Sequence, residues 1–167
     1  GKLTQLTELT LSRNQISGTL PPELSALSHL TVMQASVNNI TGSIPTWLGS
    51  LGQLRHLYLD NNNFSGPIPE ELGGLQHFES CGFSNNPLAS TIPQTLIGLP
   101  TLIAFQGVNC SLRGPLPEKL CDHADGNSES LVRFCVELRL MLQALRLVRS
   151  RCCCFPFAVH ANAPLAH

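Results

Sequence analysis

The chain has 167 residues, of which 43% are hydrophobic and 13% charged, a composition typical of a folded domain with a sizeable core. Ten Lys and Arg against eleven Asp and Glu give a net charge of -1, so there is no basic field to attract nucleic acid or an anionic membrane. The sequence contains no signal peptide and no uncharged apolar run of about 20 residues. Its seven cysteines follow neither a disulfide framework nor a paired zinc-site spacing.

Leucines recur at a constant interval of 24 residues from the start of the chain. The first column is Leu3, Leu27, Leu51, Leu75 and Leu99. The same interval links Leu6 to Leu102 and Leu9 to Phe105, in each case through three intermediate copies. Self-similarity at this period identifies a repeat architecture. We therefore predict a repeat domain over residues 1–122, with five repeats that start at residues 3, 27, 51, 75 and 99.

Each repeat begins with alternating apolar residues, as in LRHLYLDNN over residues 54–62, and this alternation predicts a short strand. Such a strand cannot bury its apolar side alone, so the copies must stack in parallel. A glycine follows at Gly18, Gly42, Gly66 and Gly114, with Ser90 in its place in the fourth copy. An aliphatic-proline pair such as Ile68-Pro69 stands two residues later. We expect the chain to turn there and return along the convex side as a short strand and a 3₁₀ or helical turn.

The repeat unit LxxLxxLxLxxNxLxGxIPxxLxxL resembles the plant-type leucine-rich repeat. This family includes the ectodomains of receptor-like kinases and receptor-like proteins, and polygalacturonase inhibitors. The resemblance covers about three-quarters of the chain and implies an α/β solenoid, with a parallel β-sheet on the concave face and short turns on the convex face. It also implies that the chain is a binding module. It does not identify the ligand, because family members bind proteins, peptides or small hormones.

A polar column runs through the repeats where each strand ends. Its members are Asn14, Asn38, Asn62, Asn86 and Cys110. A side-chain amide both donates and accepts, so we interpret the column as a structural ladder that satisfies backbone groups. Three Asn-x-Ser/Thr sequons begin at Asn39, Asn63 and Asn109 and are candidate N-glycosylation sites.

The outward strand positions of a solenoid line its concave face, where ligands commonly dock. In the first copy these positions are Thr7, Glu8, Thr10, Ser12 and Arg13, and each recurs at the repeat interval. The strongest binding candidates among them are Arg55, His56, Tyr58, Asp60, Glu79, Gln34 and Gln106. Arginine and aromatic residues are the usual anchors of binding hot spots, so we place Arg55 and Tyr58 first.

The sequence contains no catalytic constellation. Phosphate-binding loops, HExxH, GxSxG and kinase signatures are missing, and the six histidines follow no recurring metal-ligand spacing. A group at Cys121, Asp122, His123 and Asp125 matches no standard metal site. We predict no enzymatic activity, no cofactor and no metal.

The repeat fails after Cys121, so we assign residues 123–167 to a separate tail. The run LVRFCVELRLMLQALRLV contains neither Gly nor Pro and predicts a helix from about residue 130 to residue 149. It is either a helix that covers the last coil or an unrelated extension. Its charged residues argue against a membrane span. At the other end, Gly1 falls at a seam between repeats without a polar cap, so we expect the natural protein to continue upstream.

These features favour a noncatalytic module that binds a protein or peptide on its concave face, outside the cell or at its surface, as part of a longer protein. Two alternatives remain open. One is a cytoplasmic scaffold, and the other is the ectodomain fragment of a receptor-like kinase.

Overall fold

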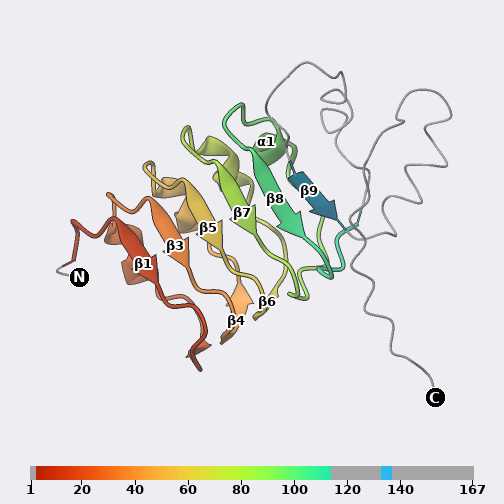
Figure 1. Ribbon diagram of the computed structural model, residues 1–167, viewed down its shortest axis with the longest axis horizontal. Helices are drawn as coiled ribbons and strands as arrows, with labels where there is room; N and C mark the ends of the chain where they lie inside the picture. The colour runs from red at the N-terminus through yellow and green to blue at the C-terminus, as the bar shows by residue number, and fades with distance from the viewer. Residues whose placement is uncertain (1–2, 114–132, 137–167) are drawn as a thin grey trace, which may run out of the picture.

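The computed structural model describes residues 3–113 and 133–136, arranged as successive coils that lie side by side (Figure 1). One strand from each coil joins a six-stranded parallel sheet, which we call the concave sheet. Its strands, in spatial order, are β1 (Glu8–Thr10), β3 (Val32–Gln34), β5 (His56–Tyr58), β7 (Ser80–Gly82), β8 (Ala104–Gly107) and β9 (Arg133–Val136). This arrangement confirms the predicted solenoid with a parallel sheet.

The concave sheet has the register that the repeat interval predicts. His56 pairs with Val32 on one side and with Ser80 on the other, so equivalent positions form straight columns across the strands. In β3, β5, β7 and β8 one residue points into the core, and these residues, Met33, Leu57, Cys81 and Phe105, are all buried. The residues on either side of each of these point outward, as alternation in a strand requires. Outward side chains of β1, β3, β5, β7 and β8 therefore stand in fixed columns, with a gap at Gly82 in the column of Tyr58.

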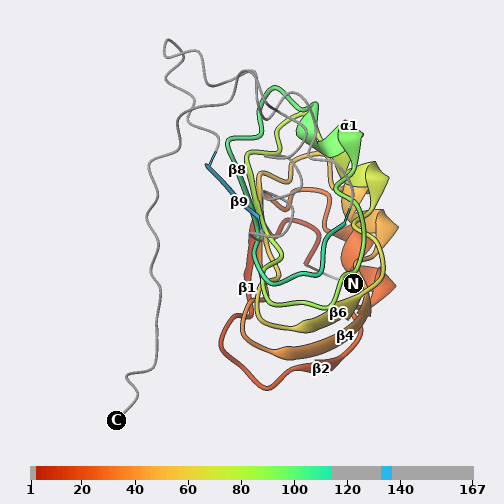
Figure 2. The same cartoon turned by 90° about the vertical axis from the view of Figure 1, so that its right-hand side faces the viewer.

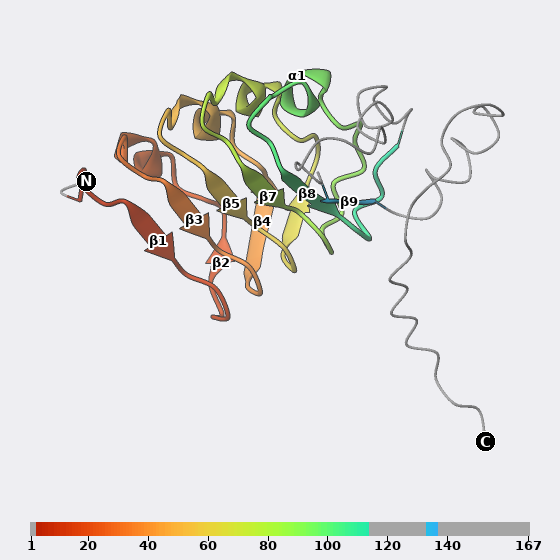
Figure 3. The same ribbon diagram turned by 45° about the horizontal axis from the view of Figure 1, so that its top comes forward.

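A second, three-stranded parallel sheet lies on another side of the coils, and we call it the outer sheet (Figures 2 and 3). It consists of β2 (Ser17–Gly18), β4 (Asn39–Ser43) and β6 (Asn63–Ser65). The glycines of the three repeats that contribute to it have φ angles of 79 to 84°, a region that glycine enters without steric cost. In the fourth repeat Ser90 replaces the glycine, and residues 87–93, which correspond to the outer strands of the earlier repeats, form no strand. The outer sheet ends at β6.

Short helical turns complete the first four coils on the convex side. They are η1 (Pro22–Ala26), η2 (Thr46–Ser50), η3 (Glu70–Gly74) and α1 (Gln94–Ile97). An extended proline precedes each of them, at Pro21, Pro45, Pro69 and Pro93. The prediction of a second short strand followed by a turn is confirmed in the first three repeats. The fourth repeat has the turn α1 but no strand in the outer sheet.

The tail departs from the sequence prediction. Arg133–Val136 is the strand β9, which pairs in parallel with β8, so the prediction of a helix is wrong at these residues. The exposed edge of β8 offers backbone hydrogen bonds that a strand satisfies and a helix does not, and this tertiary pairing outweighs local helix propensity. Phe134 is in register with Phe105. The rest of the predicted helix, over residues 130–132 and 137–149, lies outside the described residues, as do the boundary at residue 122 and the group from Cys121 to Asp125.

Burial increases from the first repeat to the third. Leu3 is 68% exposed and Ile16 36%, whereas their third-repeat equivalents Leu51 and Phe64 are completely buried. Four phenylalanines fill the centre of the third to fifth coils, at Phe64, Phe78, Phe83 and Phe105. The best-packed part of the solenoid therefore lies beneath β5, β7 and β8.

Candidate binding surface on the concave sheet

The asparagine column connects the concave sheet to the outer sheet. The Nδ2 of Asn62 donates to the carbonyls of Ala35 (2.9 Å) in the preceding coil and Leu59 (3.1 Å) in its own, while its Oδ1 accepts from the Ile40 N–H (3.0 Å). Asn38 and Asn86 make the same set of contacts in their coils. Each amide thus satisfies backbone groups of two adjacent coils, at the point where the backbone of each coil leaves the concave sheet.

The two ends of this column differ from its middle. Asn14 is exposed and donates only within its own coil, to the carbonyls of Leu11 (2.9 Å) and Ser12 (3.3 Å). At the other end the thiol of Cys110 is buried and donates to the Phe83 carbonyl (3.0 Å), a position equivalent to one of the asparagine contacts. Cys110 therefore replaces the donor function of the amide but brings no amide oxygen.

Asp60, predicted from the sequence as a binding residue, has internal hydrogen bonds. Its Oδ1 accepts from the backbone N–H of Ser84 (2.9 Å), and its Oδ2 accepts from the Ser36 hydroxyl (3.4 Å). Ser12 and Ser84 act alike, because each accepts the backbone N–H one repeat further on, from Ser36 and Val108. A Cβ on Gly82 would lie 2.3 Å from the Asp60 Oδ2, so the glycine makes room for this carboxylate. Asp60 holds three coils together at the edge of the binding face.

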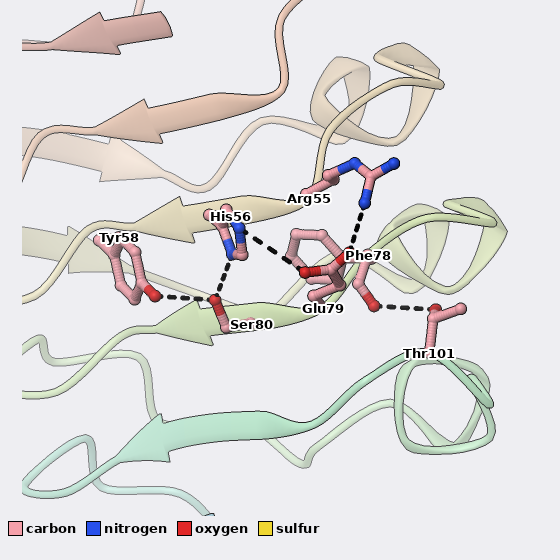
Figure 4. A network of polar contacts seen from close by, with 7 residues as sticks. All are labelled: Arg55, His56, Tyr58, Phe78, Glu79, Ser80 and Thr101. Atoms are coloured by element: carbon pink, nitrogen blue, oxygen red, sulfur yellow. Dashed lines mark hydrogen bonds and ion pairs between the residues drawn. The ribbon is translucent and has the colours of Figure 1, made fainter.

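The remaining candidates of the third repeat meet in one polar network on the outward face of β5 and β7 (Figure 4). Arg55 Nη1 and Glu79 Oε1 form an ion pair of 2.7 Å, and the second carboxylate oxygen of Glu79 lies 3.7 Å from the His56 Nε2. The other ring nitrogen of His56 hydrogen-bonds the Ser80 hydroxyl (2.7 Å), which also bonds the Tyr58 hydroxyl (2.8 Å). We call these five residues the concave network.

Two further contacts stiffen the concave network. The rings of His56 and Tyr58 are parallel within 5°, with centroids 6.5 Å apart. Thr101 donates from its hydroxyl to the Phe78 carbonyl (2.9 Å) and so fixes the chain directly before Glu79. The network side chains are held in place before any partner arrives, which reduces the entropy lost on binding.

The order Ser80, His56, Glu79 resembles the hydrogen-bond chain of a hydrolase, but the geometry does not support nucleophilic catalysis. Ser80 is only 6% exposed, and its hydroxyl is already bonded to both Tyr58 and His56. The 3.7 Å separation between His56 and Glu79 exceeds hydrogen-bonding distance. With the imidazole proton on Nε2, Tyr58 donates to Ser80 and Ser80 donates to Nδ1, so the Ser80 hydroxyl is fully used by its two neighbours. Ser80 therefore positions its neighbours.

Gln34 and Gln106 flank the concave network in the column of Tyr58. Gln34 pairs with Tyr58 in the strand register, whereas Gln106 pairs with Gly82, one strand beyond Tyr58. Gln34 is half-buried and Gln106 is exposed. The seven sequence candidates thus divide into four network members, two flanking glutamines and Asp60 in a structural position. Ser80, an outward strand position that the sequence did not single out, is the hub of the network, and its only signal was its place opposite His56.

A second asparagine chain is exposed at the edge of the concave sheet. Asn109 donates to the Asn85 Oδ1 (3.1 Å), and Asn85 donates to the Asn61 Oδ1 (3.0 Å). All three residues have left-handed backbones with φ of 56°, a conformation that asparagine tolerates well. The same column contains Val37 in the second repeat, also with positive φ, a backbone requirement that the residue pattern does not reveal.

Buried Cys81 lies beneath this face. Its burial in the core, with an added contribution from the negative charge of Asp60, raises the pKa of the thiol far above its ordinary value. The thiolate is the reactive form of cysteine, so Cys81 contributes packing rather than chemistry. No group of three or more His, Cys, Asp or Glu that could hold a metal ion occurs among residues 3–113 and 133–136. In the same residues no helix has the length and apolar character needed to cross a membrane.

Residues 4–64 match the family model described as leucine rich repeat. The same repeat pattern and the parallel solenoid continue beyond this match, through β7 and β8. This chain is a leucine-rich repeat protein. Its repeats are of the plant type, as the sequence resemblance predicted, because solved plant receptor ectodomains share both their fold and their sequence pattern.

Three of these structures illustrate the similarity. The leucine-rich repeat ectodomain of the Arabidopsis thaliana receptor kinase GASSHO1/SCHENGEN3, solved with CASPARIAN STRIP INTEGRITY FACTOR 2, is 34% identical with a TM-score of 0.71 over 81% of this chain and 16% of that one. Arabidopsis HAESA, solved with the peptide hormone IDA and the co-receptor SERK1, is 30% identical with a TM-score of 0.67, over 78% and 22%. The Arabidopsis thaliana SOBIR1 ectodomain is 30% identical with a TM-score of 0.60, over 68% and 63%.

The leucine-rich repeat chain described here is short beside most of these structures. It spans 18% of the PEPR1 chain and 16% of the GASSHO1/SCHENGEN3 chain. No curated protein matches it in sequence. The comparisons therefore place its fold and family, and they connect it with ectodomains whose solved complexes contain peptides and co-receptors.

Proposed function

We propose that the chain is a noncatalytic recognition module that binds a protein or peptide segment across the concave sheet. The concave network carries this proposal. It concentrates a guanidinium, a carboxylate, an imidazole and a phenol on two adjacent strands, and internal bonds hold all four in place. Preorganised polar and aromatic groups on an open, rigid face are suited to recognising another polypeptide.

Arg55 and Tyr58 are the anchors of the proposed site. The Arg55 side chain is 51% exposed and uses Nη1 for its ion pair with Glu79, so the rest of its guanidinium fork faces solvent. Tyr58 presents a ring face that is braced by His56 on one side. Arginine and tyrosine contribute most to binding when they are fixed near the centre of an interface. Gln34 and Gln106 extend the site with amide groups that can pair with a peptide backbone.

We place this recognition outside the cell or at its surface, as part of a longer protein. The support is the similarity to ectodomains of plant receptor kinases, two of which were solved with a peptide hormone or a named integrity factor. The net charge of -1 gives no electrostatic support to nucleic acid as a partner. No observation on the described residues favours the alternative of a cytoplasmic scaffold.

The test is a displayed library of random linear peptides, selected on the full chain. Enriched peptides are then titrated against Arg55→Ala, Tyr58→Ala and Tyr58→Phe. If the concave network is the site, each alanine variant weakens binding by about 30-fold, the loss expected for a hot-spot residue. Tyr58→Phe removes only the hydroxyl and has a smaller effect.

The matched control is Glu70→Ala, which removes an exposed charge from η3 in the same repeat, on the convex side. It leaves peptide affinity unchanged. Circular dichroism melts of all four variants confirm that each is folded. The proposal is overturned if the selected peptides bind Arg55→Ala and Tyr58→Ala as tightly as the parent, or if only Glu70→Ala weakens them.

A further inference from the structure

Two of the three sequons lie on the outer sheet, on neighbouring strands. Asn39 begins β4 and Asn63 begins β6, and both side chains are exposed. In each strand the apolar middle residue of the sequon, Ile40 or Phe64, is buried. Alternation along the strand therefore directs the asparagine and the sequon hydroxyl to the solvent side of the sheet.

The side-chain amides of Asn39 and Asn63 make no hydrogen bond to any other residue in the described part of the chain. The structure uses only their backbones, for example in the bond from the Asn39 N–H to the Ile16 carbonyl (2.8 Å). A glycan on either Nδ2 would displace no internal contact. The outward neighbours on this sheet are small and uncharged, at Ser17, Thr41, Ser43 and Ser65, so they leave room for a sugar.

The third sequon is built differently. Asn109 donates from its Nδ2 to the Asn85 Oδ1 (3.1 Å), which makes it the last member of the exposed asparagine chain. Both Asn109 and Ser111 have left-handed backbones, with φ of 56 and 51°, and Cys110 between them is buried. A glycan on this nitrogen would compete with the bond to Asn85 and would stand at the edge of the concave sheet.

We propose that Asn39 and Asn63 are N-glycosylation sites and that Asn109 is not. This inference rests on the proposed extracellular location, because the modification requires entry into the secretory route. At each site the side-chain Nδ2 forms a bond to the anomeric carbon of a lipid-diphosphate-linked oligosaccharide. The bond between that carbon and the diphosphate oxygen breaks, the amide loses one proton, and the lipid diphosphate leaves.

The location of the two sites has a consequence for recognition. In Figure 2 the outer sheet and the concave sheet occupy different sides of the coils. Glycans rooted on β4 and β6 would cover the outer sheet and keep partners away from it. The concave network would stay open, so glycosylation would direct partners to the face on which binding is proposed.

The experiment is secretion of the full chain from a eukaryotic host behind a cleavable foreign signal peptide. The purified protein is treated with an amidase that converts glycosylated asparagine to aspartate in heavy-oxygen water, and each sequon peptide is examined by mass spectrometry. We expect the heavy label at Asn39 and Asn63 and unlabelled asparagine at position 109. Asn39→Gln and Asn63→Gln each make the protein migrate faster on a gel by the shift that one glycan causes, whereas Asn109→Gln does not change the migration.

Variants that keep the asparagine guard against misfolding as the cause of a lost glycan. Ser65→Ala abolishes the second sequon. The Ser65 hydroxyl makes no hydrogen bond within residues 3–113, so this variant removes no internal contact. Thr41→Ser preserves the first sequon together with the hydroxyl that donates to the Gly18 carbonyl (3.2 Å). Label at Asn109, or its absence from Asn39 or Asn63 in a folded secreted protein, overturns the inference. Because the signal peptide is foreign, this outcome is independent of whether selected peptides bind the concave network.

Discussion

The concave and outer sides of the solenoid follow different rules. The concave sheet runs through every described coil and continues into β9, where the repeat motif has already failed. Among the described residues the outer sheet has three strands, and it stops before the repeat in which Ser90 replaces a glycine. Apolar alternation tolerates many residues at each position, so the concave sheet survives substitution. The outer side depends on single positions with unusual backbone angles or close contacts, and one substitution can end it.

The largest expected effect comes from removing the link between the two sides. Asn86 is 2% exposed, donates to the carbonyls of Leu59 (3.0 Å) and Phe83 (2.9 Å), and accepts from the Phe64 N–H (3.0 Å). Asn86→Ala removes the side-chain acceptor of the buried Phe64 N–H. It also takes one donor from each carbonyl, which Asn62 and Cys110 still contact. We expect the loss to cost about 3 kcal/mol in unfolding free energy. Urea denaturation followed by circular dichroism measures this loss.

Asn14→Ala is the matched control for that variant. Asn14 occupies the same column but is exposed, and its described contacts lie within its own coil. Its removal costs less than about 1 kcal/mol, since solvent can replace the lost bonds. Equal losses in the two variants would show that the bridging contacts do not distinguish the inner members of the column from its first one.

Gly73→Ala tests the close contacts between adjacent convex turns. A Cβ at this position would lie 2.4 Å from the Thr95 Cβ and 2.6 Å from the Thr95 carbonyl carbon, so η3 and α1 would have to separate. Overpacking of this kind costs about 2 to 3 kcal/mol. The neighbouring Gly74→Ala meets nothing within 4 Å and is expected to leave the melting temperature nearly unchanged. Similar melting curves for the two variants would contradict the packing of these turns.

Gly66→Ala tests the outer sheet by itself. Gly66 has φ of 79°, and its nearest neighbour to an added Cβ, the Ser43 Cβ, is 3.9 Å away, so the penalty arises from the backbone alone. We expect a loss of about 1 to 2 kcal/mol. Hydrogen exchange should increase in β6 while β5 and β7 keep their protection. Faster exchange throughout the concave sheet would show that the two sheets are not independent in this way.

Much of this fold can be predicted from the sequence because the interval of 24 residues fixes the register. The same interval places Arg55 beside Glu79, so their ion pair could be anticipated. The role of Ser80 could not, because it depends on side-chain rotamers that bring Tyr58 and His56 to one hydroxyl. The position of Asp60 in the repeat predicts a residue of the binding face. Its acceptance of the Ser84 N–H depends on where the next strand bends, which the residue pattern does not specify.

The tail shows a second limit of sequence reasoning. Phe134 follows Phe105 by 29 residues, so a search at the repeat interval passes over it. Residues 131–136, with the sequence LVRFCV, nevertheless contain the LxxLxL spacing of the earlier strands once the aromatic residue is counted as apolar. Local composition favoured a helix there, whereas the open edge of β8 favours a strand, and only the three-dimensional arrangement reveals that edge.

The smallest expected effect is a gain in stability at the edge of the concave sheet. Val37 has φ of 60° and is 46% exposed, although β-branched residues rarely adopt this conformation. Val37→Asn relieves that strain and brings a new amide next to Asn61, the first member of the exposed asparagine chain. We expect a gain of about 1 kcal/mol, measured as a higher melting temperature. Val108→Asn is the control, because Val108 is similarly exposed at 44% but does not have positive φ. If both variants gain equally, removal of an exposed apolar side chain is the cause, and the concave edge has no conformational requirement comparable to that of the outer glycines.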